Sequence, residues 1–71
     1  MANGRSVVPG RGEGEAIIEF RTIGQTVKVS AIDTATLAEV SIVAPASASE
    51  RQMTEAVLKK LRYVLARRKS V

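Results

Sequence analysis

The side chains that could take part in chemistry form two small groups in this chain of 71 residues. Asp33 and Glu39 flank a predicted turn, while Lys60 and Tyr63 lie close together in a predicted helix. Two carboxylates act as acid and base only where their surroundings drive their pKa values apart. A surface turn offers little burial, so we interpret Asp33 as a turn residue that accepts a backbone hydrogen bond, and Glu39 as a solvated strand end. We expect Tyr63 to cover the edge of the core.

Residue types that the sequence lacks exclude most other chemistry. The chain contains no His and no Cys, so it has no imidazole base, thiolate nucleophile, disulfide or zinc site built on them. Its aromatic residues are Phe20 and Tyr63 alone, too few to stack nucleic-acid bases. The glycine-rich run 10–14 precedes a predicted strand, whereas a phosphate-binding loop opens a helix. We therefore expect no catalytic residue, no metal and no cofactor, and we do not expect an enzyme.

Basic residues concentrate near the C-terminal end. Residues 50–71 contain seven Lys or Arg and two Glu, a net charge of +5, whereas residues 15–44 contain two basic and four acidic residues, a net charge of −2. The favoured interpretation is a solvated helix end that the helix dipole stabilises. Contact with a nucleic acid, or with another anionic surface, is the alternative, and it would be weak and non-specific because these residues scatter around the helix. The candidate contact residues are Lys59, Lys60, Arg62, Arg67, Arg68 and Lys69.

Alternating apolar residues predict three strands. The first ends at Ile23, and Gly24-Gln25 fits a two-residue type II′ hairpin loop to a second strand that continues to Ile32. That loop sets the register, with Phe20 opposite Val29 and Arg21 opposite Lys28. A third strand covers residues 39–44, and Pro45 ends it because proline lacks the amide hydrogen that a ladder needs.

A helix follows the third strand. Ser49 and Gln52 have the spacing of a capping box, as do Ser47 and Glu50, so its start is open by about two residues. Its apolar stripe consists of Met53, Val57, Leu61 and Val64, broadened by Leu58 and Leu65. Residues 1–14 are polar and glycine-rich, which is typical of a disordered tail. The predicted fold is α+β: a three-stranded antiparallel sheet and one C-terminal amphipathic helix in a single domain over residues 15–71.

A second apolar group on the predicted sheet suggests a homodimer. A domain this small buries little apolar surface by itself, and the short 45–48 connector would also allow the helix to be exchanged between protomers. The candidate interface residues are Ile17, Ile23, Ile32, Val43, Met53, Leu58 and Leu65. The most nearly apolar run, 40–46, is too short to span a membrane, so we expect a cytoplasmic protein.

The run from Phe20 to Asp33, FRTIGQTVKVSAID, continued by EVSIVAPASA from Glu39, resembles an uncharacterised family of short bacterial proteins built on a domain of unknown function. The closing segment LKKLRYVL is similar to the end of that family's domain, and the resemblance covers residues 15–68. It implies the limits of the domain and no activity. The function that we expect is therefore a small non-enzymatic binding or scaffold module, acting as a homodimer with an unidentified protein partner. The alternative is an accessory nucleic-acid-binding protein.

Overall fold

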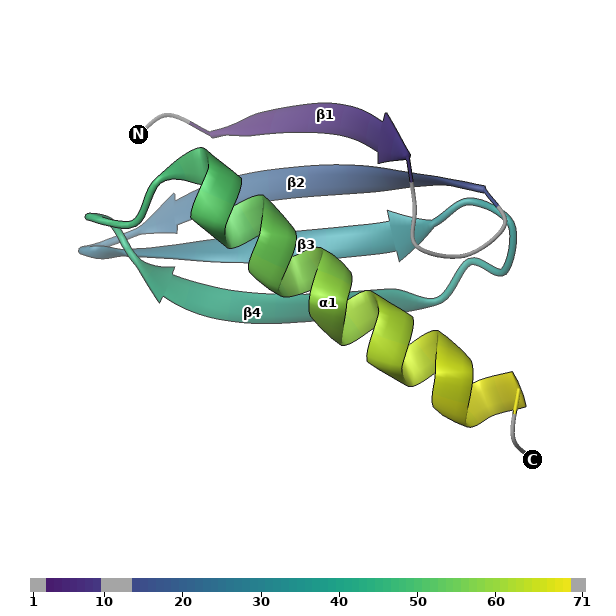
Figure 1. The fold of residues 1–71 in the computed structure, drawn as a ribbon. Coiled ribbons are helices and arrows are strands. Elements are labelled where there is room, and N and C mark those ends of the chain that lie inside the picture. Colours follow the sequence, from purple (N-terminus) through teal and green to yellow (C-terminus); the bar gives the residue numbers. More distant parts are fainter. Residues whose placement is uncertain (1–2, 10–13, 70–71) are drawn as a thin grey trace.

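Four antiparallel strands and one helix make up the structure, a computed structural model that describes residues 3–9 and 14–69 (Figure 1). The strands lie in the order β1-β2-β3-β4 across one sheet. Their bounds are Gly4–Pro9 for β1, Glu15–Ile23 for β2, Thr26–Asp33 for β3 and Glu39–Pro45 for β4, and the helix α1 covers Glu50–Lys69. The chain is α+β, as its sequence predicted.

The central hairpin has the predicted register. Phe20 lies opposite Val29, and Arg21 lies opposite Lys28. Gly24 has a φ of 61° and Gln25 has no positive φ, as a type II′ loop requires. The period-two pattern and the loop length together therefore sufficed to place every side chain of β2 and β3 on its correct face.

The prediction of three strands was wrong, because residues 4–9 add a fourth at the edge of the sheet. They pair with β2 from Gly4 opposite Phe20 to Pro9 opposite Glu15. An edge strand needs backbone partners on one side only, so a polar sequence with just Val7 and Val8 can form it. The tail interpretation is thus corrected for 4–9, while 1–2 and 10–13 lie outside the described residues.

The helix begins with the capping box that the sequence indicated at Ser49. The Ser49 amide donates to Gln52 Oε1 at 3.0 Å, and the Gln52 amide donates to Ser49 Oγ at 3.1 Å. These reciprocal bonds satisfy backbone donors that the first helical turn leaves unpaired. The alternative start at Ser47 is therefore excluded.

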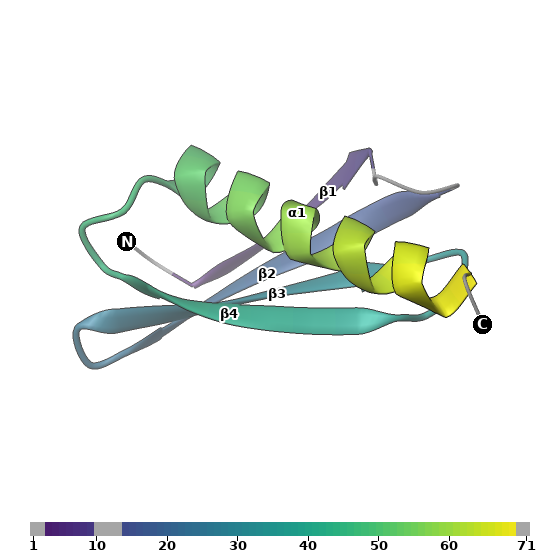
Figure 2. The ribbon, with the colours of Figure 1, turned by 60° about the horizontal axis from the view of Figure 1, so that its bottom comes forward.

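Two layers result, with α1 packed on one face of the sheet, mainly against β3 and β4 (Figure 2). The core between them includes Ile18 and Val29 from the sheet and Met53, Val57 and Leu61 from the helix, each at most 1% exposed. The other face, called the open face from here on, has no second layer among the described residues. The surfaces open to a partner include this face, the edges of the sheet and the outer side of α1.

Candidate functional site

The open face is arranged in rows that cross the strands. Residues that pair between neighbouring strands share a face, and the pairing places Val7, Ile17 and Ile32 in one apolar row that ends at Glu39. Three further rows run parallel to it, and their members are Arg5, Glu19, Ser30 and Ser41, then Arg21, Lys28 and Val43, then Ile23, Thr26 and Pro45.

The apolar group that the sequence predicted on this face divides in two. Ile17 and Ile32 lie directly opposite each other and are half-buried. Ile23 and Val43 lie towards the other end of the sheet, where they are 55% and 70% exposed. Polar residues separate the two parts, so the four do not form one continuous patch. Val7, which is 58% exposed, joins the first part, and it was missed because its segment was interpreted as a tail.

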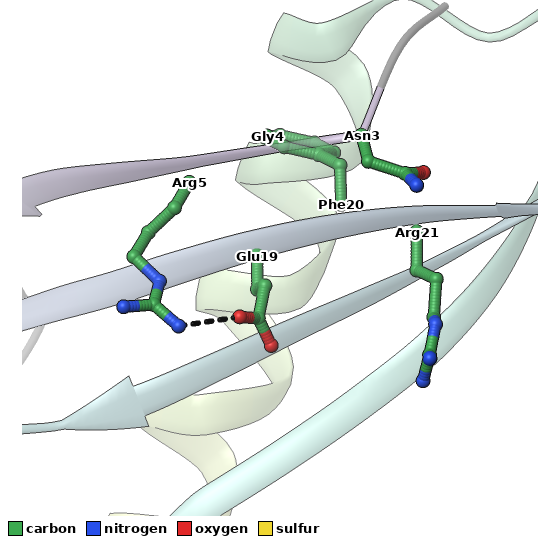
Figure 3. A pocket seen from close by; sticks show the side chains of 6 residues that line it. All are labelled: Asn3, Gly4, Arg5, Glu19, Phe20 and Arg21. Atoms are coloured by element: carbon green, nitrogen blue, oxygen red, sulfur yellow. Dashed lines mark hydrogen bonds and ion pairs between the residues drawn. The ribbon is translucent and has the colours of Figure 1, made fainter.

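A hollow of about 510 Å³ lies where β1 meets β2 on the same face (Figure 3). Arg5 Nη2 lies 2.7 Å from Glu19 Oε2 within it, and Arg21 extends clear of this ion pair. The hydrogen bond from Arg5 is the main cause that lowers the pKa of Glu19, with the charges of Arg5 and Arg21 acting in the same direction. The pair links the edge strand β1 to β2 through side chains that are largely exposed.

Arg21 and Lys28 form a like-charged pair next to Val43 on the open face. Glu19 lies one row away, and its ion pair goes to Arg5. Repulsion across a sheet costs a few tenths of a kcal/mol or more. This end of the open face is therefore basic, whereas Glu39 gives the apolar row an acidic end.

The basic residues of α1 do not converge. Lys60 Nζ donates a 2.8 Å hydrogen bond to the carbonyl of Ser41 on β4. Arg67 Nη1 donates to the Tyr63 hydroxyl at 3.2 Å, and its guanidinium carbon lies 5.6 Å from the centre of that ring. These two cations therefore have partners inside the protomer.

The remaining basic residues of the helix are more accessible. Lys59 and Arg62 line a shallow hollow of about 250 Å³ with Glu55 and Ala56. Arg68 is exposed in the last turns, and Lys69 ends the helix, its side chain lying outside the described residues. Lys59 and Arg62 thus share one side of α1, so these two cations are not scattered as the sequence predicted.

The three helical residues of the predicted interface belong to the protomer's own core. Met53, Leu58 and Leu65 are 1%, 5% and 8% exposed. Met53 and Leu65 are therefore inaccessible to a second copy that packs side by side, whereas Leu58 also lines a groove between α1 and β1. For a dimer with exchanged helices the role of all three stays a prediction.

The two carboxylates considered for acid–base chemistry point to opposite sides of the sheet. Asp33 shares the helix-covered face with Ala16, whereas Glu39 shares the open face with Ile32. Asp33 is 1% exposed, and its Oδ2 accepts bonds from the Thr36 amide at 2.9 Å and the Thr36 hydroxyl at 2.8 Å. The predicted turn role of Asp33 is confirmed, whereas the expectation that this turn offers little burial was wrong. Its Oδ1 is buried without a partner among the described residues.

The family model for a domain of unknown function, DUF6898, matches residues 13–68. The chain belongs to this family. Membership of DUF6898 assigns no function to the open face or to α1. No curated protein and no solved structure matches this DUF6898 chain.

Metal binding and membrane insertion find no support in the described part of this DUF6898 chain. It contains no group of three or more acidic residues able to hold a metal ion. None of its helices is long and apolar enough to cross a membrane. The open face of the sheet remains the best-defined candidate site of this DUF6898 domain.

Proposed function

We propose that this protein is a non-enzymatic binding or scaffold module that acts as a homodimer and uses the open face of its sheet to bind a partner protein. One observation carries the proposal: Val7, Ile17 and Ile32 lie side by side on a face that no second layer covers among the described residues. Adjacent apolar side chains on an open sheet are typical of an interaction surface.

The size of the domain supports association with a second copy. In the described residues a single helix covers one face of the sheet, and small domains gain little free energy from their own core. The chain has no Cys to form a disulfide. A second chain would add buried surface without either a larger core or a cross-link.

Light scattering across a hundredfold dilution tests the homodimer, because a monomer at every concentration would refute it. Mixed-isotope NMR tests the exchanged form. In an exchanged dimer the contacts between Met53 or Leu61 and the sheet connect differently labelled chains, whereas in a side-by-side dimer they stay within one chain.

The binding role of the open face is tested with paired baits in native lysate treated with nuclease. We expect the wild-type protein to retain a defined partner that the double variant Ile17→Ser, Ile32→Ser loses. The control is Ala56→Ser on the exposed side of α1, which should retain the partner. Equal retention by all three baits would show that the open face is not the binding surface.

A second candidate function is non-specific binding of nucleic acid by α1. It is favoured by the eleven residues 59–69, which contain six basic and no acidic residues. Such a segment attracts phosphates without reading sequence. The bonds of Lys60 and Arg67 within the protomer leave fewer cations available, so we rank this function second.

A further inference from the structure

The two edges of the sheet differ in how far they are covered. At the β4 edge, α1 packs against the strand, and Lys60 donates its 2.8 Å bond to the Ser41 carbonyl. At the β1 edge, no element of the described residues pairs with the outer side of the strand. Unpaired edges are the places where sheets add further strands.

Two hydrogen bonds show which backbone groups of β2 face β1. The Thr22 amide donates to Asn3 Oδ1 at 2.6 Å on the β1 side, whereas the Glu15 carbonyl accepts from the Thr34 amide at 3.0 Å on the β3 side. Backbone groups of alternate residues point to the same side of an antiparallel strand. Even-numbered residues of β2 therefore face β1.

The same alternation identifies the groups that β1 directs away from the sheet. The partners of the even-numbered residues of β2 are Gly4, Ser6 and Val8, so these three face inward to the ladder. Arg5 and Val7 consequently direct their amide and carbonyl groups to the free edge. Two consecutive outward donors and acceptors are enough for a short antiparallel pairing.

We propose that two copies join through their β1 edges, antiparallel, about a two-fold axis at Ser6. This inference rests on the homodimer proposed above and names its interface. The two four-stranded sheets then form one continuous sheet, with both helices on one side and both open faces on the other. The dimer would therefore double the proposed binding surface instead of consuming it.

The register follows from the sequence of the edge. An axis at Ser6 places Arg5 opposite the partner's Val7, which uses both outward donors and both outward acceptors of each copy. An axis at Arg5 would set two like charges directly opposite each other. An axis at Val7 would place Arg5 opposite Pro9, which has no amide hydrogen to donate.

A groove beside β1 supplies apolar surface to the same interface. Its volume is about 680 Å³, and it is lined by Val8, Pro9, Glu50, Arg51, Thr54, Glu55 and Leu58. Because Val8 lies two residues from the axis, the grooves of the two copies would adjoin above the paired β1 strands. The interface would then include this surface as well as the strand edges, as a stable dimer needs about 1,200–2,000 Å² in total.

Charges on the rim of the groove constrain how the two copies can meet. Arg51 Nε and Glu55 Oε2 lie 3.5 Å apart one turn along α1. A two-fold axis perpendicular to the sheet runs the two helices in opposite directions. Each rim carries Arg51 together with Glu50 and Glu55, so the two rims avoid repulsion only where each Arg51 lies near an acidic residue of the other helix.

Proline scanning of the two edges tests the pairing. Val7→Pro removes an outward amide, which a protomer tolerates at a sheet edge, and we expect it to weaken the dimer at least tenfold in sedimentation or light scattering. The matched control is Val43→Pro, which by the same alternation removes an outward amide from the β4 edge and should leave association unchanged. Circular dichroism verifies that both variants fold.

Cross-linking gives a test that does not depend on the proline variants. The chain has no Cys, so Ser6→Cys introduces a single thiol at the axis, opposite its own copy at a separation that a disulfide can bridge. We expect rapid formation of a covalent dimer under mild oxidation. Val43→Cys, 70% exposed on the open face, is the control and should cross-link slowly.

The possible outcomes separate this inference from the proposed function. A wild-type monomer at every concentration would overturn both the homodimer and its interface. A dimer that survives Val7→Pro, or that cross-links through Val43→Cys and not through Ser6→Cys, would keep the homodimer and overturn the β1 interface. Loss of association in Val7→Pro together with cross-linking at position 6 would support the inference.

Discussion

Arg5 and Glu19 face each other across β1 and β2, with the Arg5 Nη2 atom 2.7 Å from Glu19 Oε2. The ion pair lies near the start of the β1 ladder, at the second of its six pairs, where Arg5 is opposite Glu19. It joins a strand of low apolar content to the rest of the sheet. Both side chains are about half exposed or more, at 66% and 49%, so solvent and salt weaken the attraction.

The first prediction concerns the stability of the fold at low pH. The bond from Arg5 lowers the pKa of Glu19 in the folded protein. The ion pair therefore stabilises the fold fully at pH values above the usual pKa of glutamate, about 4.3. This stabilisation is lost as the pH falls through the lowered pKa of Glu19 in the folded protein. Urea unfolding at several pH values should show that the free energy of unfolding of the wild type decreases modestly below about pH 4.3. This decrease should be smaller in Glu19→Gln. Glu39 lies on the same face without an ion pair to the described residues. Its variant Glu39→Gln should therefore show the same change of unfolding free energy with pH as the wild type. Identical profiles for wild type and Glu19→Gln would contradict this prediction.

The second prediction concerns the buried carboxylate in the turn after β3. Asp33→Ala should lower the free energy of unfolding by about 1–3 kcal/mol, because it leaves the donors of Thr36 without their buried acceptor. Asp33→Asn keeps an acceptor for them and places an amide group where Oδ1 has no partner, so its loss should be smaller. Chemical denaturation measures both. Equal stability of Asp33→Ala and wild type would show that these two bonds contribute nothing.

The third prediction concerns the hairpin loop. Gly24→Ala should destabilise the fold by about 1 kcal/mol, since a side chain is strained at a φ of 61°. The control is Gly4→Ala, because Gly4 has no positive φ and an added Cβ there meets no atom within 4 Å. Thermal unfolding should therefore separate the two variants, and equal melting temperatures would argue against the type II′ loop.

The fourth prediction is that glycine in place of Leu37 stabilises the turn between β3 and β4. Leu37 has a φ of 63° and is 76% exposed, so its side chain gains little from packing while its backbone is strained. Leu37→Gly should raise the free energy of unfolding by about 0.5–1 kcal/mol. Ala35→Gly in the same turn is the control and should not stabilise the protein.

The fifth prediction tests nucleic-acid binding by α1. Any affinity should fall steeply between low and physiological salt, and Lys59→Ala with Arg62→Ala should weaken binding to all sequences alike. Lys28→Ala with Arg21→Ala removes the same charge from the open face and should weaken binding less. Fluorescence anisotropy with unrelated oligonucleotides provides the comparison. A preferred sequence that survives high salt would refute non-specific binding, and no binding at low salt would remove this function.

The structural features that could be predicted are those whose partners lie close together in the chain. The hairpin register depends on two loop residues and the alternation beside them, so Ile23 opposite Thr26 followed directly. The helix start depends on a pair three residues apart, Ser49 and Gln52, and their reciprocal bonds are present. The turn role of Asp33 likewise needed only Thr36.

β1 could not be predicted for the opposite reason. Its partner β2 is reached through residues 10–14, which are rich in glycine and carry no strand signal. Residues 4–9 have one apolar pair, Val7 and Val8, and an edge strand needs no further hydrophobic pattern. Val8 nevertheless packs on the core, and Val7 lies opposite Ile17.

The sequence by itself determined which residues alternate, where the helix starts, and that one face of a sheet would meet an amphipathic helix, because these properties arise between near neighbours. Only the tertiary structure decided that Val7 extends the pair Ile17 and Ile32, whose register the hairpin loop already implied, and that Val43 lies apart from them. It also decided that Lys60 bonds to the Ser41 carbonyl at the edge of β4 and that Met53 is buried in the core. Such roles depend on which distant segments pack together, and the free energy of that packing is shared among contacts that no local pattern contains.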